Sequence, residues 1–278
     1  MSLSTRAVSV ADYVEQGRIC LTSPPQGFRF DPALELAFID KVNQERMSRN
    51  LEPLQIRTEM RPAARFHSLD MGINDFFGHE SPDGRSHPAR ITAFDRTLIA
   101  AYTAENVAME ERVCEDRTGR VVICKGAQKV RSISTLDHIH NNLMNSPGHR
   151  ANILSADATH IALGIARVGD SVYVTQLFAD PAGLLDAPLP LRIEAGDQLT
   201  LLPHLDGWSF RRFAFVTGHV LTDLKRGLVP PSARGNVRLA LRGERMGEVE
   251  VTPDQILQSV EFSYFNGPAA MIIAPKES

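Results

Sequence analysis

The sequence predicts an α+β protein of two domains. Its 278 residues exceed the roughly 100–200 residues of a typical single domain. Helical periodicity dominates the chain as far as Leu154, and alternating apolar and polar residues dominate from His160 onward. A stretch rich in proline and glycine, DPAGLLDAPLPLR, marks a boundary near residues 180–190. Helices followed by strands indicate a sheet covered by helices rather than interleaved with them.

The composition restricts the class of partner. Hydrophobic residues make up 43% of the chain and charged residues 23%, which is typical of a globular domain. The net charge is −3 and no dense Lys/Arg run occurs, so a nucleic acid or an anionic membrane is not an expected partner. No apolar stretch approaches the roughly 18–20 residues of a transmembrane segment, and the first thirty residues lack a basic-then-apolar signal pattern. Small ligands and proteins are the expected partners.

The segment FDPALELAFIDKVNQERMSRN predicts the first amphipathic helix. Asp31 suits the N-cap position, and Pro32 suits the first helical position, where its missing N–H is not needed. Three apolar residues spaced by four then share one face of the helix, namely Leu34, Phe38 and Val42. This face is expected to pack on the core.

Three further helices are predicted in the first domain, at residues 58–77, 86–94 and 134–146. Ser86 and Ser134 are the expected N-caps of the second and third. Pro147 and Gly148 predict the end of the last helix, because proline cannot continue the hydrogen-bond ladder and glycine favours a C-terminal turn. His149 would then follow in a loop, which Arg150 and Asn152 would tie to the helix end.

Alternating patterns predict the strands. HIALGIARV and SVYVTQLFA form an expected β-hairpin around Gly169 and Asp170. Beyond the boundary, short alternating runs predict a β-rich second domain, namely RRFAFVTGHV, VRLALR, GEVEV and AAMIIA. TPDQILQSV is predicted as a helix of this domain, with Thr252 as its cap and Pro253 at its first position.

The chain has three cysteines, too few for a disulfide scaffold. Cys114 and Cys124 flank a predicted three-residue hairpin loop that would place them opposite each other. A disulfide between them and two reduced thiols are both open at this point. Cys20 is expected to be free.

Three polar residues lie beside turn signals rather than within a periodic apolar face. His79 precedes a Pro-Asp-Gly turn, Glu105 lies between small residues, and His149 follows Pro-Gly. Imidazole nitrogens and carboxylate oxygens both ligate Zn²⁺, so the three side chains are candidate metal ligands. Their spacing in the sequence does not show that they meet, and buried structural histidines are the alternative.

Other histidines are weaker candidates. His67 lies on the apolar stripe of its helix, which favours a hydrogen-bonded core histidine over a ligand. His138 and His140 are two positions apart on a helix and therefore point in different directions. Both are expected to be solvated.

Several ordered blocks resemble one protein family: FFGHESPDGRSHPARI, AENVAM, LMNSPGHRANIL and GIARVGDSVYVTQLFAD. Together with IDKVNQERMSRNLEPLQIRTEMRPAARFHSLDM they are similar to bacterial members of the CAP superfamily, which includes the cysteine-rich secretory, antigen and pathogenesis-related proteins. The resemblance runs from about residue 33 to about residue 180. It implies an α-β-α sandwich at residues 30–183, followed by a β-rich domain of unknown type at residues 190–278.

The resemblance also implies a cavity lined by two histidines and two acids. His79, Glu105 and His149 match three of these positions, and the fourth falls on Ser146, which lacks a carboxylate. Glu80 is a candidate replacement for the missing acid. Most relatives are secreted or periplasmic, so the resemblance implies export.

Three functions follow from these observations. The first is an exported binding protein whose cavity holds Zn²⁺, another divalent cation or a small ligand. The second is a metal-assisted hydrolase or peptidase in which His79 and His149 hold the metal and Glu105 acts as the base. The third is a cell-envelope interaction protein with a vestigial cavity, which binds a protein or envelope partner. The chain shows no His-Glu-x-x-His helix, no Gly-x-Ser-x-Gly elbow and no visible oxyanion donor, which favours binding over catalysis.

Overall fold

The computed structural model describes residues 8–111, 113–115, 121–123, 131–132, 135–169, 171–251 and 256–275. The chain divides into two compact units, and neither is a single stretch of sequence. The first unit includes residues 15–91 and 102–180, and the second includes residues 9–14, 92–101 and 181–278.

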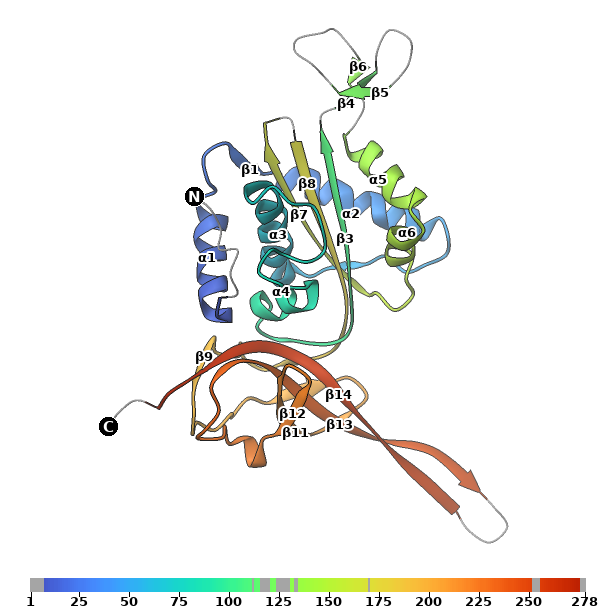
Figure 1. The fold of residues 1–278 in the computed structure, drawn as a ribbon. Helices are drawn as coiled ribbons and strands as arrows, with labels where there is room; N and C mark the ends of the chain where they lie inside the picture. Colours follow the sequence, from blue (N-terminus) through green and yellow to red (C-terminus); the bar gives the residue numbers. More distant parts are fainter. Residues whose placement is uncertain are drawn as a thin grey trace. The chain divides into compact units, whose positions relative to one another are not determined.

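The sheet of the first unit has the strand order β1-β7-β8-β3 (Figure 1). The bounds of these strands are Phe28–Phe30 for β1, His160–Val168 for β7, Ser171–Leu185 for β8 and Leu98–Glu111 for β3. A short strand, β2 (Gln55–Ile56), runs parallel to β7. The β7–β8 hairpin is confirmed, because the two strands pair in antiparallel register from His160 opposite Ala179 to Val168 opposite Ser171.

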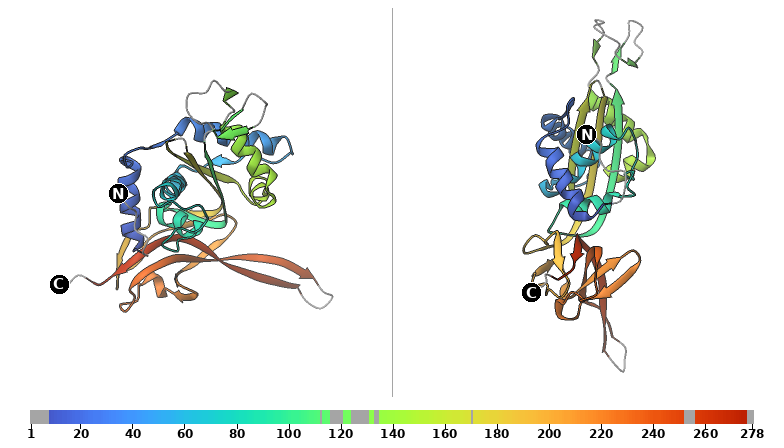
Figure 2. Two further views of the ribbon diagram at one scale, coloured as in Figure 1. Left: turned by 45° about the horizontal axis from the view of Figure 1, so that its top comes forward. Right: turned by 60° about the vertical axis from the view of Figure 1, so that its left-hand side comes forward.

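Helices cover both faces of this sheet, as an α-β-α sandwich requires (Figure 1, Figure 2). One face packs against α2 (Pro32–Met47), α5 (Thr135–Asn145) and α6 (Pro147–Ile153). The other face packs against α3 (Arg61–Ile73), which follows a 3₁₀ turn at Thr58–Met60. The predicted fold class is therefore confirmed in the first unit.

Helix α2 follows its sequence signals closely. The Asp31 side chain accepts a hydrogen bond from the Leu34 amide at 3.1 Å, and Pro32 begins the helix. Phe38 and Val42 are fully buried in the core against β7 and β8. The predicted cap and the predicted apolar face are both confirmed.

Helix α3 crosses β7 in direct backbone contact at Gly164. A Cβ atom at this position would lie 2.2 Å from the backbone nitrogen of Arg65, so only glycine fits. The Ser68 hydroxyl donates to the Gly164 carbonyl at 2.9 Å and also contacts the Thr175 hydroxyl at 2.8 Å. These bonds fix the helix over β7 and β8.

The prediction that a helix ends at Pro147 and Gly148 is confirmed to within two residues, but the prediction that His149 follows in a loop is wrong. Helix α5 ends at Asn145, Ser146 is extended, and Pro147 then begins a second helix, α6. A proline at the first helical position loses no hydrogen bond and has a favourable φ, so Pro147 can begin a second helix directly after the first one ends. His149 consequently lies in the first turn of α6.

A small three-stranded sheet follows β3 in the order β5-β4-β6, with bounds Val121–Ile123, Val113–Glu115 and Arg131–Ser132. Cys114 pairs with Val122, so the predicted register, which placed Cys114 opposite Cys124, is wrong. Cys124 itself lies outside the described residues, so a disulfide to Cys114 and two reduced thiols both stay open. Cys20 is a buried free thiol, as predicted.

Helix α1 (Val10–Thr22) was not predicted. Helix α4 (His87–Phe94) follows Ser86, whose carbonyl accepts a hydrogen bond from the Arg90 amide at 3.0 Å. The predicted start of α4 is confirmed.

The second unit is β-rich. Its strands have the order β14-β13-β11-β12, and β9 runs parallel to β14. The bounds are Arg192–Glu194 for β9, Pro203–Leu205 for β10, Ser209–Thr217 for β11, Val220–Asp223 for β12, Gly235–Val251 for β13 and Ile256–Ile273 for β14. A 3₁₀ turn, η2 (Lys225–Gly227), follows β12. The core of this unit includes Phe213, Phe215, Leu239, Leu241 and Phe265.

The helix predicted at TPDQILQSV is wrong. Residues 252–255 lie outside the described residues, and Ile256 begins β14, which pairs with β13 from Val251 opposite Ile256. Thr-Pro-Asp is a turn composition as well as a helix-start composition, and the long pairing with β13 decides between the two.

Candidate functional site

The structure brings three of the four predicted site residues together. His79 lies in the loop between α3 and α4, Glu105 in β3 and His149 in the first turn of α6. His79 Nδ1 donates to Glu105 Oε1 over 3.0 Å. The ring centroids of His79 and His149 are 6.4 Å apart, with an angle of 50° between the ring planes. His79 is open to solvent, with 56% of its side chain exposed.

Strand β3 explains how residues from two helical layers converge. Consecutive residues of a strand point to opposite faces, so Glu105 and Asn106 reach different layers. Glu105 bonds His79 on the face of α3 and α4, whereas the Asn106 amide donates to the His149 carbonyl on the face of α6 over 3.0 Å. β3 is the last strand in the order of the first unit, and its two neighbouring residues thus connect to His79 and to His149.

Glu105 is held by a buried ion pair with Arg90, which the sequence did not single out. Arg90 Nη2 donates to Glu105 Oε2 over 2.6 Å, and the two side chains are 0% and 1% exposed. The same guanidinium donates to the backbone carbonyls of His79 and Arg85. Each carboxylate oxygen of Glu105 therefore already has a donor, one from Arg90 and the other from His79.

These contacts shift the pKa values of the site in different directions. Burial alone would raise the pKa of Glu105, but the hydrogen bond from His79 and the charge of Arg90 outweigh it and lower that pKa. The hydrogen bond to Glu105 raises the pKa of His79, although burial partly offsets it. Burial, followed by the nearby His79, lowers the pKa of His149. His79 is thus the ring of the pair that protonates first.

His67 is a structural histidine, as predicted. It is fully buried and its Nε2 donates to the Gly78 carbonyl over 3.0 Å. Burial and the nearby Arg90 lower its pKa to about 3, so the ring is neutral. Ser81 lies between His67 and Arg90, with its hydroxyl 3.5 Å from His67 Nδ1 and 3.3 Å from Arg90 Nη1. This chain of contacts fixes the loop that carries His79.

A second polar network, also missed in the sequence, positions His149. Asn106 is fully buried and bonds the His149 carbonyl, the Gln176 side chain and the Asn152 side chain at 2.9–3.0 Å. Asn152 also donates to the Glu105 carbonyl over 3.1 Å. Asn152 therefore ties α6 to β3, whereas the sequence predicted that it ties a loop to a helix end. The sequence signal that could have identified Asn106 as a site residue was its position directly after Glu105.

The remaining predicted positions contribute less. Ser146 is half-buried at the N-cap of α6 and makes no capping hydrogen bond to that helix. Across the described part of the chain, no hydrogen bond links the Ser146 side chain to His79, Glu105 or His149. Glu80, the candidate replacement acid, is exposed.

The expectation that His138 and His140 are both solvated is wrong. His140 is 2% exposed and packs edge-on against Phe38, with ring centroids 5.9 Å apart. His138 is partly buried and its Nδ1 donates to Glu110 over 2.9 Å. Both residues point toward protein rather than water because α5 lies between α2 and β3.

The donor set of the site consists of two imidazoles. Within the described ranges, no group of three or more His, Cys, Asp or Glu side chains is placed to hold a metal ion. Glu105 is the partner that orients His79, an arrangement typical of metal-binding histidines, and among the described residues no hydrogen bond engages His79 Nε2. A cation bound here would be held by His79 and His149, with its other positions open. The same contacts do not suit Glu105 as a general base, because both its oxygens are already hydrogen-bonded.

Comparison with known proteins supports the resemblance seen in the sequence. Residues 39–178 match the sequence model described as CAP, the cysteine-rich secretory protein family. The chain is 29% identical over 144 residues to YkwD of Bacillus subtilis (strain 168), described as an uncharacterized protein. The match covers 52% of this chain and 46% of YkwD, so the chain spans about half the length of that relative.

Three solved structures are also similar to this chain. An extracellular protein containing a SCP domain from Bacillus anthracis str. Ames is 24% identical, with a TM-score of 0.40, over 53% of this chain and 40% of that chain. An outer surface protein from Borrelia burgdorferi is 16% identical, with a TM-score of 0.42, over 55% and 98%. A cysteine-rich secretory protein from Staphylococcus aureus subsp. aureus Mu50 is 16% identical, with a TM-score of 0.35, over 54% and 39%. None of the helices in the described residues is both long and apolar enough to span a membrane.

Proposed function

Because the chain belongs to the cysteine-rich secretory protein family, we propose that it is an exported binding protein that takes a divalent cation between His79 and His149. The observation that carries this proposal is the hydrogen bond from His79 Nδ1 to Glu105, which is itself held by Arg90. A neutral His79 with its proton on Nδ1 has a lone pair on Nε2. The second imidazole, His149, is 6.4 Å away between ring centroids.

The buried Arg90–Glu105 pair supports binding more than catalysis. A histidine oriented by a carboxylate binds a metal with its ring direction and tautomer already fixed. A bound cation would act there as a Lewis acid toward a small ligand. A hydrolase would need a free base, whereas Glu105 is buried and its pKa is lowered, so it takes up a proton poorly at neutral pH.

Calorimetric titration with Zn²⁺ tests the proposal. We expect one site in the wild type and its loss in a His79→Ala/His149→Ala double variant. A matched control removes two exposed histidines of the second unit, His204 and His219, and should keep the site. Equal Zn²⁺ affinity in the wild type and the His79→Ala/His149→Ala variant would show that the proposal is wrong.

The Glu105→Gln variant separates the roles of Glu105. As an orienting partner, Glu105 supports Zn²⁺ affinity, and its loss should weaken binding by about 10–100-fold without changing the stoichiometry. A metal-dependent turnover that disappears in Glu105→Gln would instead favour the hydrolase.

Export is proposed from family membership, and fractionation of the producing bacterium tests it. We expect the protein outside the cytoplasm, in the periplasm or the medium. Recovery of the protein with the envelope, combined with no measurable affinity for Zn²⁺, would favour the cell-envelope interaction protein with a vestigial site.

A further inference from the structure

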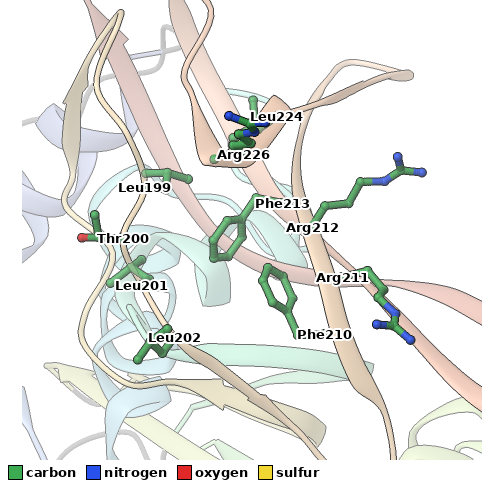
Figure 3. A pocket seen from close by; sticks show the side chains of 11 residues that line it. Leu199, Thr200, Leu201, Leu202, Phe210, Arg211, Arg212, Phe213, Leu224 and Arg226 are labelled. Atoms are coloured by element: carbon green, nitrogen blue, oxygen red, sulfur yellow. The ribbon is translucent and has the colours of Figure 1, made fainter.

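A separate hollow lies within the second unit, in the region that the family match does not cover. It has a volume of about 380 Å³, within the range of roughly 300–1,000 Å³ typical of ligand pockets. Its walls are the loop at residues 199–202, residues 210–213 of β11, and Leu224, Arg226 and Gly227 of the turn that follows β12 (Figure 3). Leucine and phenylalanine side chains dominate the lining.

A β-bulge directs two phenyl rings toward this hollow. Residues three apart on a regular strand face opposite sides, but an extra residue at Arg211 interrupts the pairing of β11 with β13. Phe210 pairs with Gly243 and Phe213 with Leu241, so both rings lie on the same face. Their centroids are 4.7 Å apart, and Figure 3 shows them side by side, across from the leucines of the loop.

Hydrogen bonds join two walls of the hollow. The Leu199 amide donates to the Gly227 carbonyl over 2.9 Å, and the Gln198 side chain donates to the Arg226 carbonyl over 3.0 Å. Gly227 has φ of +77°, and a Cβ there would lie 2.7 Å from the Leu199 carbonyl oxygen. The two walls therefore meet at a junction that admits no side chain.

One cation at the rim is available for a ligand. Arg211 pairs with Glu244 at 2.8 Å and Arg212 with Asp223 at 3.2 Å, and Figure 3 shows both guanidiniums directed away from the phenyl pair. Arg226 is exposed, and none of the carboxylates that the structure describes pairs with it. Its φ of +53° is rare for a residue with a side chain, and Arg226 adopts it in the turn that lines the hollow.

We propose that this hollow binds an aliphatic carboxylate, with the hydrocarbon chain against Phe210 and Phe213 and the carboxylate on Arg226. Burial of an alkyl chain against leucine and phenylalanine supplies affinity that does not depend on its charge. A guanidinium that lacks an internal partner pairs well with a carboxylate, often through two hydrogen bonds. The apolar lining beside one free cation therefore selects an amphipathic monoanion over a neutral or cationic chain.

The chain contains its own fluorescent reporter for this unit. Trp208 is the single tryptophan of the chain and packs against the same core, with its ring 5.4 Å from Phe265 between centroids. Titration with dodecanoate below its micelle-forming concentration should change the fluorescence of Trp208 and saturate at one ligand per chain. Dodecanol, which has the same chain length but no charge, should bind about tenfold or more weakly.

Variants at the rim locate the site. Arg226→Gln should lower the affinity for dodecanoate about tenfold, and Arg226→Lys should lose less because it keeps the charge. Lys225→Gln is the matched control, since Lys225 is an adjacent exposed cation that does not line the hollow. The His79→Ala/His149→Ala variant should bind dodecanoate like the wild type. The proposal is overturned if the wild type does not bind dodecanoate, if Arg226→Gln binds it as tightly as the wild type, or if dodecanol binds equally well.

Discussion

Arg90 and Glu105 form an ion pair with 2.6 Å between Nη2 and Oε2, and both side chains are excluded from solvent. The pair links α4 to β3, and Arg90 also donates to the backbone carbonyl of His79 over 2.9 Å. One guanidinium therefore fixes the backbone of His79 and, through Glu105, its ring. Arg90 therefore positions His79 although a ligand bound to His79 need not contact Arg90.

Replacing Arg90 with methionine should destabilise the protein by about 3–5 kcal/mol, because it leaves the Glu105 carboxylate buried without its cation. The Arg90→Met/Glu105→Gln variant should be more stable than Arg90→Met, since the second change removes the unpaired charge. Urea unfolding followed by circular dichroism measures both free energies of unfolding. A double variant that is less stable than Arg90→Met would contradict this account of the pair.

The two histidines of the site should affect stability with opposite dependence on pH. The pKa of His79 is raised in the folded protein, so the native state binds its proton more tightly than the unfolded state does. The stabilisation by His79 is complete below the ordinary pKa of about 6.5 and is lost as the pH rises through the folded pKa. His79→Gln should therefore lose most stability, relative to the wild type, in acid.

The contribution of His149 to stability has the opposite dependence on pH, because the pKa of His149 is lowered in the folded protein. Protonation then favours the unfolded state, so the wild type should weaken relative to His149→Gln as the pH falls below about 6.5. Unfolding free energies of the wild type and the two single variants between pH 5 and pH 8 check both signs. Parallel pH profiles for the two variants would refute the assigned pKa directions.

Local signals predicted the fold of the first unit well. Asp31 and Pro32 fix the start of α2 through interactions within the first turn, so the sequence around them contains the information needed. The β7–β8 hairpin is likewise set by a two-residue connection and alternating apolar residues. Turn signals singled out His79, Glu105 and His149 as candidates, but only the resemblance predicted that they meet, because 70 positions separate the histidines and no local pattern brings them together.

Features decided by long-range contacts were missed or wrongly predicted. Arg90 is a polar residue in a short helix, and only the fold shows that it is buried against Glu105. Pro147 has the same local signal whether it follows one helix or begins another, and the packing of α6 against β3 through Asn152 decides between them. At Ile256 the pairing with β13 overrides a local helix signal in the same way.

Replacing each of two glycines, Gly164 and Gly148, with alanine should change the free energy of unfolding in opposite directions. Gly164→Ala places a Cβ 2.2 Å from the backbone of Arg65, and neither β7 nor α3 can move without breaking the sandwich, so we expect a loss of about 4 kcal/mol or no folded protein. Gly148→Ala meets no atom within 4 Å in α6 and should stabilise the protein by about 0.5–1 kcal/mol, because alanine favours a helix. Urea midpoints measure both. A stable Gly164→Ala protein would contradict the close crossing of α3 over β7.

Asp70 in α3 is a buried carboxyl group whose removal should stabilise the protein at neutral pH. It is 7% exposed, and burial raises its pKa to about 6 although the Asn74 side chain donates to it over 2.7 Å. The native state therefore binds this proton more tightly than the unfolded state, whose aspartate has a pKa of about 3.9. Below a pH of about 3.9 Asp70 is protonated in both states, so its burial costs no charge-related stability. Above the folded pKa of about 6 it is ionised in both states, and burial of the charge lowers stability by the full amount. Asp70→Asn should then add about 1–3 kcal/mol at pH 7.5 and little at pH 4, at about 1.4 kcal/mol per pKa unit.

Urea unfolding of Asp70→Asn at these two pH values measures the effect, with Asp157→Asn as the control, since Asp157 is exposed. The control should change stability by less than about 0.5 kcal/mol at either pH. The asparagine oxygen at position 70 can still accept the hydrogen bond from Asn74, so the variant removes the charge and keeps the contact. If Asp70→Asn is less stable than the wild type at pH 7.5, the carboxylate is stabilised by its hydrogen bonds more than it is penalised by burial.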